Sequence, residues 1–379
     1  MPHSFPGGPG LFRLDPAVAH LNHGSFGTVP VPVQAVQAAL REEQERDPDA
    51  FYLRVPDRVA AARARIAAHL GAEEGGIALI PNVTEGINVV LNSLRLDAED
   101  EVLVTDHGYG TVSEAAGRGA RLRTVSLRPD APDEAAVRER VLAAVTGRTK
   151  VAVLDHITSP TARIVAGPQL LAALAERGVT TVVDGAHAPG MLPEPLAGAP
   201  DFWFGNLHKW AYAPRGTAVL AVAPRWRARI RPLAPSWEDH HGFPRSLEWR
   251  GTIDYTPWLA APDGLDLLAR LDAQQVRAHN CALAAYGGQV LAERVGLRPM
   301  PHSEGVAMRA LRLPPGVAET RDSAHALLRE IADRLRTRVL VWPWPGGGGL
   351  RISAQIYNHP REYEQLATGL AALLDGRRP

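Results

Sequence analysis

An aspartate and a lysine each follow a short apolar run near the middle of this 379-residue chain. Asp184 comes directly after residues 181–183, and Lys209 lies 25 positions later, beyond the apolar residues 202–204. Pyridoxal phosphate requires this pair, because a lysine amine holds it as a Schiff base and a carboxylate keeps its ring nitrogen protonated. The two residues therefore predict a site for this cofactor. The simpler alternative is that Asp184 caps a helix and Lys209 is a surface charge.

Groups that could bind the cofactor phosphate lie close to these two residues in the sequence or after a neighbouring strand. Asn206 and His208 precede Lys209, and we expect both to donate hydrogen bonds to the phosphate. Residues 77–80 predict a strand that leads into a helix capped by Thr84. The first N–H groups of such a helix attract anions, so Val83 and Thr84 are predicted to bind the phosphate as well. Lys209 must also lose its proton to react, and a dry pocket beside a cationic cofactor favours this.

Strand and helix patterns alternate along the first two thirds of the chain, which predicts an α/β fold with a mostly parallel sheet covered by helices. Ligands of such sheets bind beyond the carboxyl ends of the strands, so the residues there are candidates. Among them are His107, whose ring could stack on the cofactor, Ser159 and His187. Besides residues 77–80, strands are expected over residues 101–105, 121–126 and 150–154, with helices over 33–46, 54–70, 109–117 and 134–144 and from Pro168 to Gly178.

Length and composition limit the organisation and the partners. A chain of this length predicts an N-terminal arm (1–20), a large cofactor-binding domain (21–261) and a small C-terminal α+β domain (262–379). Lys plus Arg equals Asp plus Glu, 41 against 41, so no overall charge favours nucleic acid or a membrane surface. The single Cys281 excludes a disulfide within the chain, and residues 1–10 lack a signal-peptide pattern, so we expect a cytoplasmic protein.

For other polar groups a simpler explanation competes with a binding role. The acidic and histidine residues 238–241 are neighbours in sequence and rarely converge on one ion, so no metal is predicted. The basic run 224–232 is interpreted as a solvated helix face rather than a nucleic-acid patch. Arg351 lies on a predicted strand with alternating apolar neighbours. It is either a surface residue or the bidentate clamp for a substrate carboxylate.

Seven motifs together resemble the class V aminotransferase family of fold type I pyridoxal phosphate enzymes, and in particular its isopenicillin N epimerase-like branch. They are TVVDGAHAPG, GNLHKW, NVTEG, TDHGYG, HITSPTA, WRGTIDYTP and RISAQIYN, and they occur in the family's order over nearly the whole chain. LNHGSFGTVP near the start is also similar to that branch.

The resemblance implies a role for each matched residue. Lys209 would bind the cofactor covalently, Asp184 would pair with its ring nitrogen and His107 would stack on the ring. Ser159 and His187 would lie near the phenolic oxygen, where cysteine desulfurases of this family carry Asn and Gln. The phosphate would be held by Val83, Thr84, Asn206 and His208, together with Thr252 of a neighbouring subunit, which implies a homodimer. The substrate would be bound by Arg351, His23 and Tyr357.

The reaction itself has several possible outcomes once the Cα proton of an amino acid is removed. An epimerase returns the proton to the opposite face, for which Tyr109 is a candidate acid, whereas a carbon–sulfur lyase expels a group from Cβ and an aminotransferase reprotonates the cofactor. A cysteine desulfurase needs a cysteine on a mobile loop, and Cys281 lies in a helical stretch, so that activity is excluded. Epimerisation of an amino acid or its conjugate is the preferred hypothesis, followed by the lyase. A non-catalytic dimer that retains the fold is the alternative from another class.

Overall fold

The computed structural model describes residues 2–127, 134–344 and 347–375. By its internal contacts the chain divides into two compact units. We call Pro32–Thr158 with Ile164–Arg270 the sheet unit, and Met1–Val31, Ser159–Arg163 and Leu271–Pro379 the terminal unit. The boundary expected at residue 261 falls inside one helix, α10 (Thr256–Arg270), and residues 21–31 belong to the terminal unit rather than to the unit that contains the large sheet.

The sheet unit is built on seven strands in the order β2-β8-β7-β6-β5-β3-β4. The pairs from β7 through β6, β5 and β3 to β4 are parallel, whereas β8 runs antiparallel to both β7 and β2. The mostly parallel sheet predicted from the sequence is therefore present. The strands are β2 (Ile77–Ile80), β3 (Glu101–Thr105), β4 (Arg121–Val125), β5 (Thr149–Asp155), β6 (Thr180–Asp184), β7 (Phe202–Asn206) and β8 (Ala218–Val222).

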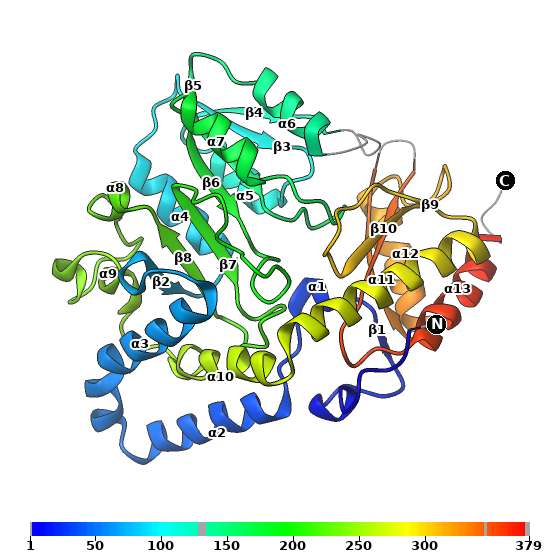
Figure 1. The fold of residues 1–379 in the computed structure, drawn as a ribbon, viewed down its shortest axis with the longest axis horizontal. Coiled ribbons are helices and arrows are strands. Elements are labelled where there is room, and N and C mark those ends of the chain that lie inside the picture. The colour runs from blue at the N-terminus through cyan, green and yellow to red at the C-terminus, as the bar shows by residue number, and fades with distance from the viewer. Residues whose placement is uncertain (1, 128–133, 345–346, 376–379) are drawn as a thin grey trace. The chain divides into compact units, whose positions relative to one another are not determined.

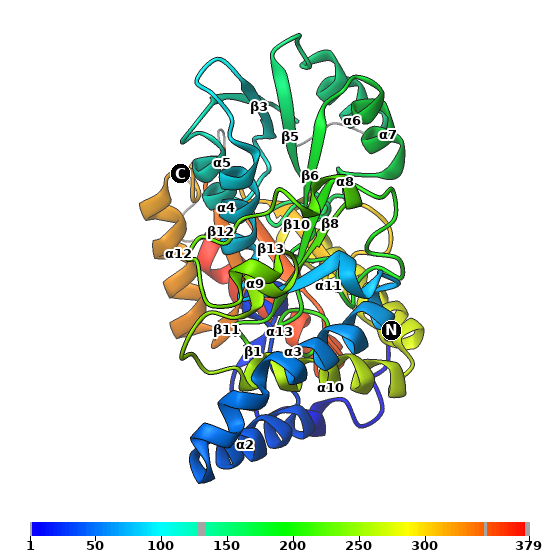
Figure 2. The same cartoon turned by 90° about the vertical axis from the view of Figure 1, so that its left-hand side faces the viewer.

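Helices cover both faces of this sheet, and alternate strand residues point into two separate cores. In β5, Val153 packs into the core beneath α4 (Val83–Leu94) and α5 (Gly110–Ala116), whereas Leu154 faces the opposite core. That opposite core is covered by α3 (Pro48–Leu70), α6 (Glu134–Ala143), α7 (Pro168–Glu176) and α10. Figure 2 shows α4 and α5 on one side of β5 and β6, with α6 and α7 on the other. Figure 1 shows α3 and α10 lying side by side.

The start of α4 differs from the sequence prediction in its capping residue. The Asn82 side chain caps the helix, because its Oδ1 accepts the N–H of Glu85 at 2.9 Å, and Thr84 lies inside the first turn. The prediction of Thr84 as the cap was therefore wrong, since Asn82 holds the extended backbone that a cap requires. Gly86 packs closely on the sheet, where a Cβ would lie 2.9 Å from Ile80 Cδ1 and 3.3 Å from Phe204 Cβ. The contact with Phe204 places this turn of α4 close to the end of β7.

The terminal unit has its own core between helices and a four-stranded antiparallel sheet of order β12-β13-β10-β9. Arg351 lies on β13, as predicted, and is fully buried there. A second sheet pairs two short strands in parallel, β1 (Ala19–His20) with β11 (Thr337–Arg338). The other elements are α1 (His23–Phe26), α11 (Ala273–Val295), α12 (Arg321–Arg334), α13 (Pro360–Asp375), β9 (Arg298–Pro299), β10 (Met308–Arg312), β12 (Leu340–Trp342) and β13 (Gly349–Ser353).

Three further helices complete the sheet unit: α2 (Val31–Arg46), α8 (Pro224–Arg227) and α9 (Arg245–Glu248). The basic run 224–232 thus contributes only a single helical turn, α8. None of the helices in the described residues combines the length and the apolar character needed to cross a membrane.

Candidate functional site

Three polar side chains end neighbouring strands on the same face of the large sheet. Asp155, Asp184 and Asn206 are the last residues of β5, β6 and β7. Each lies two positions after a residue of the core beneath α4, respectively Val153, Val182 and Phe204. Because successive strand residues alternate between faces, all three side chains point toward the α4 side. The sheet therefore collects two carboxyl groups and an amide at one edge.

Lys209 follows this edge and forms a hydrogen bond with His187. Its Nζ lies 3.1 Å from His187 Nε2, and the residue is only 9% exposed. The indole N–H of Trp210 donates to His187 Nδ1 at 3.3 Å, so Nδ1 is an acceptor. A neutral imidazole then carries its proton on Nε2 and donates it to the lysine nitrogen. The lysine nitrogen can accept this bond only as a neutral amine, which is the form that reacts as a nucleophile or base, whereas its charged form is the one that acts on the neighbouring Asp184 and His208.

Asp184 is buried and presents one carboxylate oxygen to the backbone. Its Oδ1 accepts the N–H of Ala186 at 2.9 Å. Burial raises the pKa of the Asp184 carboxyl to about 6, although the Ala186 N–H and the Lys209 charge both oppose the rise. A cation placed beside it would favour the ionised carboxylate, since an opposite charge in a buried site lowers the pKa of an acid.

The N-terminus of α4 presents a backbone donor to the same edge. The N–H of Val83 is already bound to Asn206 Oδ1 at 3.2 Å, so Val83 does not present the donor predicted for it. Among the described residues none accepts the N–H of Thr84. The amide of Asn206 has its oxygen engaged, which leaves its NH₂ group as the donor. Thr84 and Asn206 can thus both donate to an anion at this helix end.

His208 has a defined tautomer that changes the role predicted for it. Its Nδ1 donates to the carbonyl oxygen of Thr217 at 3.1 Å, so the neutral ring carries no proton on Nε2. Burial, with a smaller contribution from the charge of Lys209, lowers the pKa of His208 to about 4. As a neutral ring His208 accepts at Nε2. It can donate to a phosphate only after a proton is taken up with that anion.

The segment after β3 contributes a buried ring and an exposed one. His107 follows β3 and is fully buried, with its Nε2 3.9 Å from Asp106 Oδ1. Tyr109 precedes α5 with half of its side chain exposed. The stacking of His107 on the cofactor stays a prediction. The hydroxyl of Tyr109 has no hydrogen bond among the described residues.

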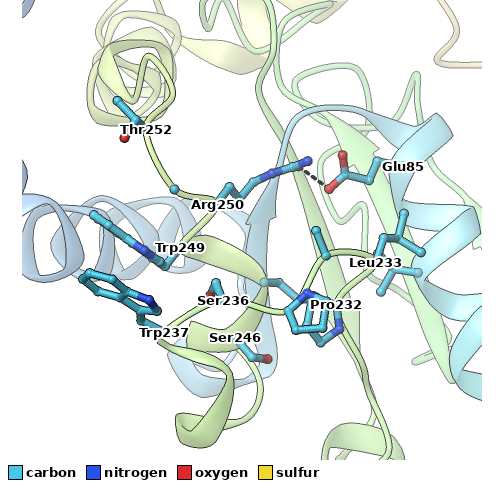
Figure 3. Close-up of a pocket in the computed structure, with 14 residues that line it drawn as sticks. Glu85, Pro232, Leu233, Ser236, Trp237, Ser246, Trp249, Arg250 and Thr252 are labelled. Atoms are coloured by element: carbon cyan, nitrogen blue, oxygen red, sulfur yellow. Dashed lines mark hydrogen bonds and ion pairs between the residues drawn. The ribbon is translucent and has the colours of Figure 1, made fainter.

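Thr252 lies in a different part of the sheet unit, on the wall of a cavity of about 450 Å³. Figure 3 shows Arg250 reaching across this cavity to the ion pair with Glu85 of α4, while Trp249 and Trp237 lie below it. Thr252 is exposed, and so is Trp237, at 88%. The cavity is therefore lined on one side by the first turn of α4 and on another by the exposed Trp237.

The terminal unit holds a buried arginine whose described partners are all neutral. The guanidinium of Arg351 donates from Nη1 to the carbonyl oxygen and the Oγ of Ser159, at 2.6 and 3.0 Å. Its Nη2 donates to Asn22 Oδ1 at 2.9 Å and to Ser25 Oγ at 3.2 Å. No described carboxylate pairs with it. Burial lowers the pKa of Arg351 to about 10, so the group remains a cation at neutral pH.

His23 and Tyr357, predicted to line a substrate pocket, bind each other. The oxygen of Gln355 accepts hydrogen bonds from Asn280 Nδ2 and from the Ile356 N–H, at 2.9 and 2.8 Å, so its nitrogen is the donor toward His23 Nε2 at 3.2 Å. His23 therefore carries its proton on Nδ1 and donates it to the Tyr357 hydroxyl oxygen at 3.0 Å. The tyrosine accepts this bond, and its own proton points elsewhere.

The structure thus groups several of the predicted residues, and it assigns some of them new partners. Asp184, His187, Asn206, His208 and Lys209 lie at the carboxyl ends of β6 and β7 or in the segments that follow. Ser159 contacts Arg351 rather than belonging to the sheet unit, and His187 contacts the lysine amine.

Sequence reasoning missed Asp155, Asn82, Trp210, Asn22 and Ser25. Asp155 did carry a signal, since it ends an apolar run as Asp184 does. The acidic and histidine residues 238–241 join no cluster suited to a metal ion in the described parts of the chain.

Comparison with known proteins adds a family and a fold. The model of the family described as Aminotransferase class-V matches residues 39–365. The chain is 36% identical to the isopenicillin N epimerase of Streptomyces clavuligerus, over 96% of this chain and 97% of that protein. It is 30% identical to a putative L-cysteine desulfhydrase of Oryza sativa subsp. japonica, over 95% of this chain and 85% of that protein.

Among solved structures, a lysine variant of C-DES with glycine covalently linked to its PLP cofactor superposes with a TM-score of 0.81. It is 18% identical, over 97% of this chain and 98% of that chain. This likeness confirms the predicted fold.

Proposed function

The chain belongs to the aminotransferase class-V family, and from this premise we propose that it epimerises the α-carbon of an amino acid or an amino-acid conjugate. Family membership confirms the predicted resemblance, the enzyme class and the pyridoxal phosphate cofactor. When bound, this cofactor joins a primary amine as a Schiff base and withdraws electrons from the Cα–H bond. The roles of individual residues in this chain are our proposal.

One observation carries the proposal: the Lys209 Nζ lies 3.1 Å from His187 Nε2, and the proton that Trp210 places on this ring nitrogen favours the neutral form of the lysine. A neutral, buried amine can bond to the cofactor and, once released, take a proton from Cα. The same hydrogen bond fixes the direction of the lysine side chain. His187 therefore acts as a positioning residue for Lys209, and Trp210 sets the tautomer of His187.

The strand-end groups fit the rest of the cofactor by charge and by donor type. Asp184 is a buried acid that a protonated ring nitrogen would keep ionised. Thr84 and the amide nitrogen of Asn206 supply donors for the phosphate at the α4 terminus, and His208 supplies a third when it takes up a proton. His107 is the ring we assign to stacking. The set therefore contains groups for the ring nitrogen and for the phosphate of the cofactor.

Arg351 is proposed to bind the substrate carboxylate. A fully buried guanidinium whose partners among the described residues are neutral acceptors retains its full charge, and a carboxylate is the ligand that its planar fork fits best. Asn22, Ser25 and Ser159 fix the plane of the fork. His23 and Tyr357 are assigned to the same substrate site, where the tyrosine offers an O–H donor backed by the histidine.

A homodimer is part of the proposal, with Thr252 contributed to the phosphate site of the partner subunit. Support comes from the exposed side chains beside Thr252: Trp237 is 88% exposed and Leu233 is 50% exposed, and both line the cavity in Figure 3. Large apolar side chains exposed around one cavity are typical of a protein interface.

The second candidate is a carbon–sulfur lyase, which the 30% identity to a putative L-cysteine desulfhydrase favours. Incubation of the loaded enzyme with candidate amino acids in deuterated water separates the two reactions. Deuterium at Cα with inverted configuration and no loss from Cβ supports epimerisation, whereas release of a thiol with pyruvate supports the lyase and contradicts our proposal.

Lys209→Ala is the matched control for this experiment. We expect it to keep its fold and its circular dichroism while losing both deuterium exchange and product. Borohydride reduction of the loaded wild type must leave the cofactor attached to the peptide that contains Lys209. A reduced adduct on another residue would refute the assignment of the lysine.

A further inference from the structure

Asp155 is a second buried carboxyl group directly beside Asp184, and the proposed mechanism leaves it unused. The two residues are register partners on the adjacent parallel strands β5 and β6. The N–H of His156 donates to the Asp184 carbonyl oxygen at 2.7 Å, which ties the two strand ends together. Adjacent strands lie about 4.8 Å apart. Both side chains point toward α4, so the two carboxyl groups are neighbours.

Both members of this pair are buried, and no ion pair is described for either carboxyl group. Asp155 is 6% exposed and Asp184 4%, and neither forms an ion pair with a described lysine, arginine or histidine. Lys209, in the segment after β7, is a cation that acts on both carboxyl groups, and its charge lowers both pKa values, but burial outweighs this charge in each case. Two adjacent buried carboxylates repel each other strongly and share a proton instead.

The surroundings decide which member of the pair holds the proton. Burial, and then the charge of Asp184, raises the pKa of Asp155 well above its usual range, although the backbone N–H groups of Asp155 and Tyr109 oppose this. Burial raises the pKa of Asp184 only to about 6. The first proton lost therefore comes from Asp184. The titratable groups that act on Asp155 are Asp184 of β6 and Lys209.

The geometry points to Asp155 as a positioning residue: it is a neutral carboxylic acid that donates a hydrogen bond to the Asp184 carboxylate. This bond fixes the orientation of that carboxylate and reduces the negative charge on its oxygens. This role rests on the proposed function of Asp184 as partner of the ring nitrogen. An O–H donor withdraws charge from its acceptor, so Asp184 binds a proton on the ring less tightly than an isolated carboxylate would. Asp155 thereby sets how strongly the ring nitrogen is protonated without touching the cofactor.

The first experiment examines the apoprotein and does not depend on the proposed function. A neutral carboxylic acid has a carbonyl band in the infrared that a carboxylate lacks. We expect such a band from the wild-type apoprotein at pH 7, and its loss in Asp155→Asn, which keeps a neutral donor of nearly the same shape. A wild-type spectrum without a protonated carboxylic acid at pH 7 would overturn the proposal, even if the variant failed to fold.

Thermal unfolding of the same two apoproteins gives a second readout. An acid whose pKa is raised by folding stabilises the folded state below its unfolded pKa and loses this contribution as the pH rises toward its folded pKa. The Tm of the wild type should thus fall relative to that of Asp155→Asn between pH 5 and pH 8, by about 2 °C per pH unit. A difference in Tm that is independent of pH contradicts a protonated Asp155.

The effect on the cofactor is read from the ring nitrogen itself. With ¹⁵N-labelled pyridoxal phosphate bound, Asp155→Asn should keep the wild-type nitrogen shift, and Asp155→Val, which lacks a donor, should move it toward the protonated form. Equal shifts in all three proteins would refute the link from Asp155 to the ring while leaving Lys209 and the proposed reaction intact. If no protein binds the labelled cofactor at Lys209, the proposed function fails, and the infrared result still decides the state of Asp155.

Discussion

Arg351 Nη1 donates a hydrogen bond of 3.0 Å to the hydroxyl oxygen of Ser159, and the other described partners of this buried guanidinium are neutral as well. Burying a cation without a paired anion is costly, and proteins accept the cost where an anion binds. Ser159, predicted to lie near the cofactor ring, thus accepts hydrogen bonds that hold the Arg351 guanidinium in place.

Replacing Arg351 by lysine keeps the charge and removes the planar fork. Because hydrogen bonds to charged groups contribute about 1.5–3 kcal/mol, we expect KM for the substrate to rise about 10- to 100-fold. Asn22→Ala, which removes one acceptor of Nη2, should give a smaller rise of about fivefold with kcat little changed. Steady-state kinetics and the affinity for a non-reactive carboxylate analogue measure both effects. An unchanged KM in Arg351→Lys would contradict the assigned role.

Ser159→Ala separates the two positions considered for this serine. If its hydroxyl supports Arg351, as the 3.0 Å contact indicates, KM rises and the absorbance spectrum of the bound cofactor keeps its pH dependence. If the hydroxyl instead binds the phenolic oxygen, the spectrum changes and KM is preserved. We expect the first result.

His187 is predicted to increase the rate at which the Lys209 amine reacts with pyridoxal phosphate. His187→Phe removes the N–H that the lysine amine accepts, so the apoprotein should take up pyridoxal phosphate about tenfold more slowly at pH 7. His187→Gln is the matched control, since its amide can still donate. Stopped-flow absorbance follows the uptake. Equal rates in all three proteins would exclude a role of His187 in positioning the amine.

The pKa of His208 predicts a loss of apoprotein stability in acid. Folding lowers this pKa from 6.5 to about 4, so the unfolded state binds the proton first as the pH falls. The contribution of His208 is intact above pH 6.5 and declines between pH 6.5 and pH 4, by at most about 3 kcal/mol. His208→Asn retains a donor for Thr217 and should show a smaller loss of stability over this pH range. The loss that remains is due to His156, because burial lowers its pKa to about 4 as well. Urea unfolding at several pH values measures the free energy of unfolding, and the same pH dependence in the wild type and in the variant would contradict the prediction.

Binding of phosphate should reverse the protonation of His208. A dianion beside Nε2 favours the imidazolium, so inorganic phosphate should bind the apoprotein with uptake of a proton near pH 7. Calorimetry in two buffers of different ionisation enthalpy measures the number of protons. The uptake should vanish in His208→Asn, and a similar uptake in that variant would assign the proton to another group.

Mixing an inactive variant with an impaired one tests whether Thr252 acts across a dimer. Lys209→Ala lacks the lysine, and Thr252→Ala weakens the phosphate site. If Thr252 completes the partner's site, a mixed dimer has one intact site, so roughly a quarter of the wild-type activity returns after subunit exchange. If Thr252 acts within its own subunit, no activity beyond that of Thr252→Ala itself returns. Analytical ultracentrifugation must find a dimer in either case for the proposal to stand.

The sequence by itself determined the elements that carry the sheet-unit chemistry. Asp184 and Lys209 could be placed after strands because an apolar run that is rich in Val or Phe and ends in a polar residue is a local pattern. The alternation of such runs with helices likewise determined a mostly parallel sheet, and the strand that carries Arg351 was also predicted. These features depend on residues close together in the chain, so a short stretch of sequence is enough to predict them.

Only the tertiary structure decided which of these groups face each other. That Asp155 lies beside Asp184 depends on β5 and β6 being neighbours in register, and that Ser159 contacts Arg351 joins residues 192 positions apart. Asn82 rather than Thr84 caps α4 because the backbone at position 82 is extended, and the turn from β2 into α4 sets that conformation. Tautomers, counter-charges and burial arise from such long-range packing, so they could not be predicted from the order of residues alone.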